Sequence, residues 1–360
     1  MDRRTFLTTG ALAAVCSHVD PAFAYSSGKL RSQTLAFVEQ SQFSGVVLVG
    51  RGPRTLYCEA FGLADRSTNR PVTRQTIFEA GSISKWIASI VTLHLVDRQK
   101  LDLHRPIGAY LPEFRKDIGD RVTLEHLLSH TSGIPNDIIP ALRANPHLAE
   151  LGLTQKEAIQ RHASGDLRFP PGTGWDYSHS NWILVQAIVE RVAEMNYRRF
   201  AAETLWKPLK LERSGIYSGT GPDEPDVALS YAAAETGMQP IVQRMPGFLE
   251  MAGGFYCSSG DLLHLMDAAT TGSLLSRRSR QEMFRVRWPK ENYALGCRVD
   301  AGIFGHKQSR FISEDGSNAG FRSVAYRIFE DGHTCILLNN TSMPLNHTGP
   351  FALQLLQTMA

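Results

Sequence analysis

The sequence predicts an α+β fold in which an antiparallel sheet, flanked by helices, is assembled from both ends of the chain. Short apolar runs typical of strands occur at residues 45–50 and 55–62, and again after residue 293. The residues between them carry mainly helical patterns. A chain of 360 residues exceeds the usual size of one hydrophobic core, so two packed lobes are expected, with a helical lobe inserted into the one that bears the sheet.

Residues 1–24 have the features of an export signal. The pair Arg3-Arg4 precedes a short apolar run at residues 11–15, and Ala22-Phe23-Ala24 is a small-x-small cleavage site. The run is too short to span a bilayer. A lipoprotein reading through Cys16 is the weaker alternative, because the preceding residue is a poor fit to a lipobox. We therefore expect a twin-arginine signal, cleavage after Ala24 and a periplasmic or secreted protein.

The sheet-bearing lobe is expected to combine residues 25–80 with residues 251–360. A helix is predicted at residues 30–40, followed by the two N-terminal strands. In the C-terminal part a capped helix is predicted near Asp261. Beyond it we expect strands at residues 293–299, 322–328 and 333–338. A terminal helix at residues 351–359 is expected to cover the sheet that they form. Asp331-Gly332 is a good hairpin turn between two of those strands.

Residues 81–250 are predicted to form the mainly helical lobe. Apolar residues recur at helical spacing directly after residue 85. Thr154 and Glu157 form the sequence pattern of a capping box, and residues 182–195 carry a further amphipathic pattern. The sequence contains no internal repeat, charge block or low-complexity linker, which argues against separate domains joined by linkers.

Composition and motifs exclude several classes of function. The net charge of +3 gives no basic footprint for nucleic acid or an anionic membrane. The sequence has no Gly-x-Ser-x-Gly elbow and no glycine-rich phosphate loop. No cofactor is expected, the partner is a small-molecule or peptide substrate, and the oligomeric state stays open.

Two further groups of residues have a structural interpretation. His126 and His130 are four apart and could share a metal on one helical face, but no third ligand is evident, so structural histidines are favoured and no metal is predicted. Four cysteines follow the signal: Cys58, Cys257, Cys297 and Cys335. Export permits disulfides, but a core of this size does not need them, and some or all of the four are expected to be buried as small apolar residues.

Ser82 and Lys85 are the principal candidates for catalysis. Residues three apart share a face of a helix, so their side chains can meet across one turn. A serine hydroxyl becomes nucleophilic when a neighbouring base takes its proton, and a lysine can be that base if its pKa is lowered. The motif alone is common, usually a helix cap followed by a solvated lysine. Other stretches of the chain decide between these readings.

Five stretches together resemble the serine β-lactamase-like family, which includes class C β-lactamases, D-Ala-D-Ala carboxypeptidases and related esterases. They occur in the family's order: residues 78–85, 127–135, Pro171-Gly172-Thr173 with Tyr177-Ser178, 252–254 and 316–321. The resemblance spans about residues 30–345. It implies a β-lactamase/transpeptidase-like fold, with the active site between an α/β lobe and a helical lobe, and catalysis through an acyl-serine.

The resemblance also implies roles for individual residues. Ser82 would be the nucleophile, Lys85 its partner base and Tyr177 a second proton-transfer group. Because tyrosine has an unperturbed pKa of about 10, Lys85 would have to depress that pKa or act in its place. The backbone N–H groups of Ser82 and Ser317 would form the oxyanion hole, with Gly316 allowing the strand to approach the substrate.

The sequence departs from the family pattern at two motifs. His179 stands where the family has Asn after Tyr177, and could either contact substrate or orient Lys85, or be a packed residue. Glu314-Asp315-Gly316 stands where Lys-Thr-Gly or His-x-Gly is usual. Two acidic residues there should repel a substrate carboxylate. We therefore expect a neutral ester or amide, or a substrate with an amino group near the reaction centre, in preference to a β-lactam.

Two hypotheses from different classes remain at this point. The first is an exported serine hydrolase that acts through acyl-Ser82 on an ester or amide, whether β-lactam, peptide or small ester. The second is a non-catalytic, penicillin-binding-protein-like module that binds cell-wall fragments or a protein partner. The retained Ser82, Lys85 and Tyr177 favour the enzyme, whereas the altered residues His179 and Glu314 keep the binding module open.

Overall fold

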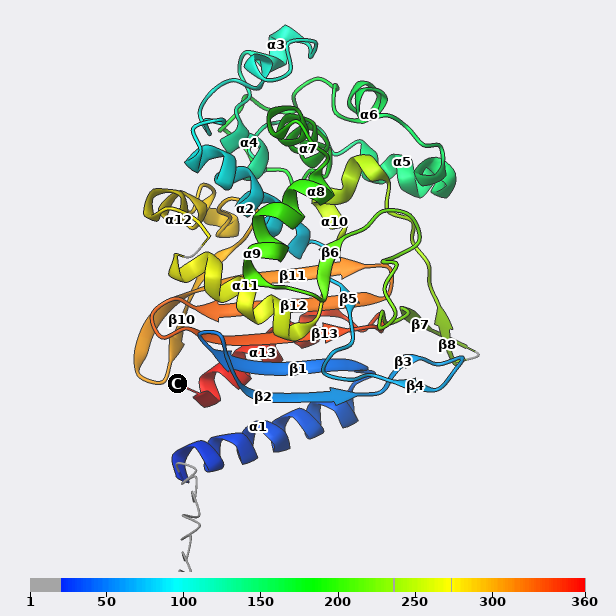
Figure 1. Cartoon of the computed structure of the whole chain (residues 1–360), viewed down its shortest axis with the longest axis vertical. Coiled ribbons are helices and arrows are strands. Elements are labelled where there is room, and N and C mark those ends of the chain that lie inside the picture. Colours follow the sequence, from blue (N-terminus) through cyan, green and yellow to red (C-terminus); the bar gives the residue numbers. More distant parts are fainter. Residues whose placement is uncertain (1–20, 236, 273, 360) are drawn as a thin grey trace, which may run out of the picture.

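The fold is built on a six-stranded antiparallel sheet to which both ends of the chain contribute (Figure 1). The computed structural model describes residues 21–235, 237–272 and 274–359. Residues 1–20, which carry most of the predicted export signal, lie outside them. Across the sheet the strand order is β10, β11, β12, β13, β1, β2. The strands are β1 (Gly45–Arg51), β2 (Arg54–Phe61), β10 (Val299–Phe304), β11 (Lys307–Asn318), β12 (Phe321–Ile328) and β13 (His333–Asn339).

The join between the two ends of the chain is the β1–β13 pair. Its register runs from Gly45 opposite Asn339 to Arg51 opposite His333. Both strands are covered on both faces, which explains why β1 is a continuous apolar run rather than an alternating one. Because side chains alternate along a strand, Val46 packs into the core on one face, whereas Val47 packs into a second core on the other.

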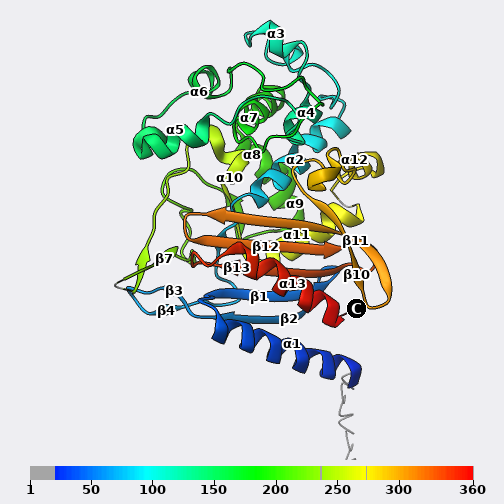
Figure 2. The same ribbon diagram turned by 180° about the vertical axis from the view of Figure 1, so that it is seen from behind.

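Helices cover both faces of this sheet. Helices α1 (Pro21–Gln40) and α13 (Leu345–Met359) lie together on one face, as Figure 2 shows, and their Phe37 and Phe351 rings stack at 4.0 Å. Helix α11 (Ser259–Thr271) covers the opposite face against β1 and β13. The predicted helices at both termini are present, although each begins earlier than its periodicity indicated.

The remaining helices gather above β11, on the side of the sheet away from β2 (Figure 1). The longer ones are α2 (Ile83–Asp97), α5 (Ile138–Ala144), α6 (Gln155–His162), α7 (Ser180–Ala193) and α12 (Arg277–Met283). The shorter ones are α3 (Lys116–Gly119), α4 (Leu124–Leu128), α8 (Tyr197–Ala201), α9 (Lys207–Leu209) and α10 (Glu250–Gly253). Single turns complete the group: η1 (Ile107–Ala109), η2 (Pro146–Glu150), η3 (Ala202–Trp206), η4 (Gly247–Leu249) and η5 (Pro289–Glu291).

Three small sheets accompany the main sheet. They are β3 (Leu63–Asp65) with β4 (Arg70–Pro71), β5 (Phe78–Glu79) with β9 (Phe255–Cys257) and β6 (Ser214–Ile216), and β7 (Tyr231–Ala234) with β8 (Gly237–Pro240). Residues 81–250 therefore contain short strands as well as helices. Within the described residues, no helix is long and apolar enough to cross a membrane.

The strand predicted at residues 293–299 is wrong, because β10 begins only at Val299. Residues 293–298 instead form a loop against α2. Gly296 has φ +69°, and a Cβ atom there would lie 2.5 Å from the carbonyl oxygen of Lys85. Its N–H donates to the Leu128 carbonyl at 2.9 Å. The close approach to α2 takes this segment out of the extended conformation.

Candidate active site

Ser82 lies at the start of α2, directly after strand β5. The turn between them uses Gly81, whose φ of +54° favours glycine. Ser84 fixes the turn, since its hydroxyl donates to the Gly81 carbonyl at 2.6 Å and accepts the N–H of Phe255 at 2.9 Å. The Ser82 side chain makes no capping hydrogen bond, although Ser82 is the N-cap residue of α2. Its hydroxyl is therefore available for chemistry, at a helix N-terminus that favours negative charge.

Lys85 lies one turn further along α2 and contacts the Ser82 hydroxyl. Its side chain is only 1% exposed, and Nζ lies 3.1 Å from Ser82 Oγ and 2.7 Å from the Ala252 carbonyl oxygen. Burial lowers the pKa of Lys85 to about 7, although the nearby Glu314 opposes that shift. At neutral pH a large fraction of Lys85 is thus an uncharged amine able to accept the serine proton.

Tyr177 joins this pair from the loop before α7. Its hydroxyl hydrogen-bonds to Ser82, and its ring centroid lies 5.0 Å from Lys85 Nζ. Burial raises the pKa of Tyr177 above its ordinary value of 10. Of the two roles expected for Lys85, lowering the pKa of Tyr177 is therefore not the one observed. Tyr177 stays a neutral phenol at pH 7 and can donate a proton, while Lys85 provides the basic group.

His130 lies against Tyr177. The two rings stack with centroids 4.4 Å apart, and His130 Nδ1 accepts the N–H of Ser178 at 3.0 Å. His126 instead completes the capping box of α4 with Thr123. No group of three or more histidine, cysteine or acidic side chains among the described residues is arranged to hold a metal. The structural interpretation of both histidines is the one that fits these contacts.

The backbone of Gly316 and Ser317 approaches the nucleophile from β11. A Cβ atom on Gly316 would lie 1.9 Å from the Ala80 carbonyl oxygen, and one on Gly81 would lie 2.5 Å from the Ser317 nitrogen. Ser317 is exposed and lines the same cavity as Ser82. Only glycine at these two positions lets the strand and the helix start come this close. The two segments that would supply the oxyanion hole are thus in contact.

The expectation that Glu314 and Asp315 present negative charge to substrate is not met. Glu314 is 3% exposed, does not line the cavity, and accepts the backbone N–H of Arg298 at 2.7 Å. Burial raises its pKa to about 8. Asp315 points to the other face of β11, toward Tyr326, and burial raises its pKa to about 6. Tertiary packing, which spacing does not reveal, buries both carboxyl groups.

His179 lies at the cavity wall near Ser82. Its backbone N–H donates to Asn136 Oδ1 at 3.0 Å, whereas its Nδ1 is buried and has no hydrogen-bond partner among the described residues. Burial and the positive charges of Lys85 and Arg143 hold the pKa of His179 well below its ordinary value. His179 is therefore a neutral imidazole at pH 7.

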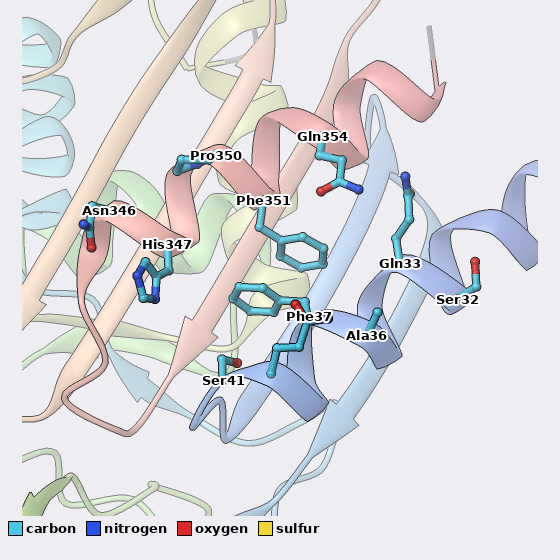
Figure 3. Close-up of a pocket in the computed structure, with 11 residues that line it drawn as sticks. Ser32, Gln33, Ala36, Phe37, Ser41, Asn346, His347, Pro350, Phe351 and Gln354 are labelled. Carbon is cyan, nitrogen blue, oxygen red and sulfur yellow. The ribbon is translucent and has the colours of Figure 1, made fainter.

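The cavity over Ser82 has a volume of about 920 Å³. Its walls come from α5, η2, residues 242–246, η4 and the end of β11. Residues within 140–150 and 242–246 contribute to these walls, and which substrate they select cannot be inferred from their sequence, because the pairing of the loops depends on the folded topology. A separate groove of about 680 Å³ lies between α1 and α13, where Figure 3 shows the facing rings of Phe37 and Phe351. No lysine is among the residues that line this groove, so it has no counterpart of the Ser82–Lys85 pair.

The four cysteines of the described chain are all buried and unpaired. Of the two possibilities that the sequence left open for them, burial as small side chains is the one observed.

Comparison with known proteins identifies the family. The beta-lactamase family model matches residues 30–353. PbpX of Bacillus subtilis (strain 168), provisionally named a penicillin-binding protein, is 27% identical over 315 residues, which are 86% of this chain and 73% of PbpX. Esterase EstB of Burkholderia gladioli is 32% identical over 219 residues, which are 56% of this chain and 55% of EstB.

A solved structure shows the same fold. It is the octameric penicillin-binding protein homologue from Pyrococcus abyssi, with a TM-score of 0.78 at 23% identity. The match covers 91% of this chain and 77% of that one. The family match over most of the chain, together with this architecture, supports one conclusion: the chain belongs to the beta-lactamase family of serine hydrolases.

Proposed function

We propose that this protein is an exported hydrolase that cleaves carboxylic esters and amides through an acyl-enzyme on Ser82. The observation that carries the proposal is the buried Lys85 amine, 3.1 Å from Ser82 Oγ, with a pKa lowered to about 7. The partial similarity to an esterase supports ester substrates. The export signal predicted at residues 1–24 supports a location in the periplasm or outside the cell.

In the first half of the reaction, Ser82 Oγ attacks the substrate carbonyl while Lys85 Nζ accepts the hydroxyl proton. The negative charge that develops on the carbonyl oxygen is stabilised by the backbone N–H groups of Ser82 and Ser317. Tyr177, which is protonated at pH 7, donates a proton to the leaving group. The products are the free alcohol or amine and an ester of Ser82.

In the second half, water attacks the acyl-Ser82 ester. Tyr177, which lost its proton in the first half, accepts a proton from the water, and Lys85 returns the proton that it took to Ser82 Oγ, which leaves as the reformed hydroxyl. This step restores the starting protonation of all three side chains.

The test is hydrolysis of three chromogenic substrates by the wild type and by Ser82→Ala: 4-nitrophenyl butyrate, a D-alanine 4-nitroanilide and a chromogenic cephalosporin. The proposal expects ester or amide turnover that disappears in the variant. Binding of a substrate without turnover by the wild type would overturn the hydrolase and favour the non-catalytic binding module.

A further inference from the structure

The charges that line the cavity over Ser82 are unbalanced. Within the described residues, five ionisable side chains line it: Arg143, His147, Glu150, His179 and Arg244. The only carboxylate among them, Glu150, is already engaged. It accepts Arg244 Nε at 3.0 Å and lies 3.3 Å from His147 Nδ1. The charge of Arg244 is therefore compensated, and that of Arg143 is not.

Arg143 is a cation without a partner among the described residues. It lies in the last turn of α5, is exposed to solvent, and forms no ion pair or hydrogen bond with another described residue. The positive charge of Arg143 contributes to the lowered pKa of His179, so Arg143 acts electrostatically on the part of the cavity wall that lies near Ser82. Glu314 and Asp315 do not line the cavity. A guanidinium with its donors unoccupied is well suited to bind a carboxylate through two parallel hydrogen bonds.

The wall of this cavity also carries apolar side chains. Ile139 and Leu142 belong to α5, the helix that bears Arg143, and Met245 and Leu249 line the same cavity. A substrate that spans this wall needs an apolar segment between its reacting carbonyl and any charged group, because an unpaired charge against apolar side chains loses hydration without compensation.

We infer that the cavity selects esters or amides that carry a carboxylate at the far end of an apolar segment, bound by Arg143. This inference rests on the proposed hydrolase function. It reverses the preference expected from the acidic third motif, since those acids are buried and the accessible lining is cationic.

The experiment compares mono-4-nitrophenyl esters of linear dicarboxylic acids with the same compounds methylated at the distal carboxylate. The measured quantity is the ratio of kcat/KM for the anionic ester to kcat/KM for its neutral methyl ester. We expect wild type to favour the anionic member, and Arg143→Gln to lower the ratio by about tenfold, as expected for loss of one charge-assisted hydrogen-bonded contact. High salt should lower the wild-type ratio as well.

Two variants control for general effects of charge. Arg121→Gln removes an exposed arginine that does not line the cavity, and should leave the ratio unchanged. Glu150→Gln releases Arg244 from its ion pair and should raise the ratio. Opposite shifts in Arg143→Gln and Glu150→Gln cannot come from a common loss of folding.

The outcomes separate this inference from the proposed function. Ser82-dependent hydrolysis with equal or lower kcat/KM for the anionic esters, or an equal fall of the ratio in Arg121→Gln, would overturn the Arg143 subsite and leave the hydrolase intact. Absence of Ser82-dependent turnover of either series would overturn both.

Discussion

Lys85 Nζ lies 3.1 Å from Ser82 Oγ and is withdrawn from water, with the Ala252 carbonyl as its other partner. The carbonyl oxygen of Ala252 accepts a hydrogen bond from the Lys85 amine and orients it. Burial lowers the pKa of Lys85 to about 7. One turn of α2 thus combines a nucleophile with a base that is partly deprotonated at neutral pH. The following predictions depend on this relationship.

Replacing Lys85 by methionine should lower kcat/KM for an ester by about 10³, the size expected for loss of a general base. Lys100→Met, which removes an exposed lysine, should leave kcat/KM unchanged.

The free energy of unfolding should increase, rather than decrease, when Lys85 is replaced by methionine. Because the pKa of Lys85 is lowered from 10.5 to about 7 on folding, its charge destabilises the wild type at and below pH 7, and this cost fades as pH rises toward 10.5. Thermal unfolding should therefore show Lys85→Met gaining most relative to the wild type at low pH.

The value of kcat/KM should increase with pH through about pH 7, as Lys85 loses its proton. Burial raises the pKa of Glu314 to about 8, so Glu314 is mostly uncharged where Lys85 titrates, and Glu314→Gln should leave this limb close to its wild-type position. Glutamine keeps an oxygen for the Arg298 N–H. A limb that moves to lower pH by about one unit in this variant, measured with the same ester, would show instead that Glu314 is ionised beside the base.

Tyr177→Phe should separate substrates by their leaving groups. The ring can keep its stacking on His130, so the loss is confined to the hydroxyl. An amide needs its leaving amine protonated, and its kcat/KM should fall by about 10² or more. A 4-nitrophenyl ester releases a stable anion and should be affected much less. Equal losses for both substrates would argue against Tyr177 as the proton donor.

Gly316→Ala should destabilise the protein by about 1–3 kcal/mol, as overpacking of a tight contact does. The added methyl group would lie 1.9 Å from the Ala80 carbonyl oxygen. Gly260→Ala is the matched control, because no atom lies within 4 Å of a Cβ there and the position is helical. Chemical denaturation of both variants checks the difference, and equal free energies of unfolding would contradict the close contact between β11 and the start of α2.

The sequence anticipates the parts of this protein that depend on local spacing. Ser82 and Lys85 are three residues apart on one helix, so their contact follows from helical geometry. The antiparallel sheet follows from apolar runs at both ends of the chain. Tyr177 is close to Ser82 only because the loop before α7 reaches α2, and the family resemblance rather than spacing identified it.

For features that depend on long-range packing, the sequence supported either no prediction or a wrong one. The acidic pair Glu314-Asp315 is visible in the sequence, but only the fold shows that neither side chain lines the cavity. Arg143 carried no signal, since its role depends on Glu150 being engaged by Arg244 from a distant loop. The contact of Gly296 with α2, which ends the expected strand, is likewise a tertiary effect.

The most direct test of the account is labelling of the protein that lacks residues 1–24 by a fluorescent fluorophosphonate, followed by mass mapping of the modified residue. We predict a single adduct on Ser82, formed faster above pH 7 than below it and absent in Ser82→Ala. Lack of any adduct in a folded protein, or an adduct that persists in Ser82→Ala, would contradict an activated Ser82 as the centre of this site.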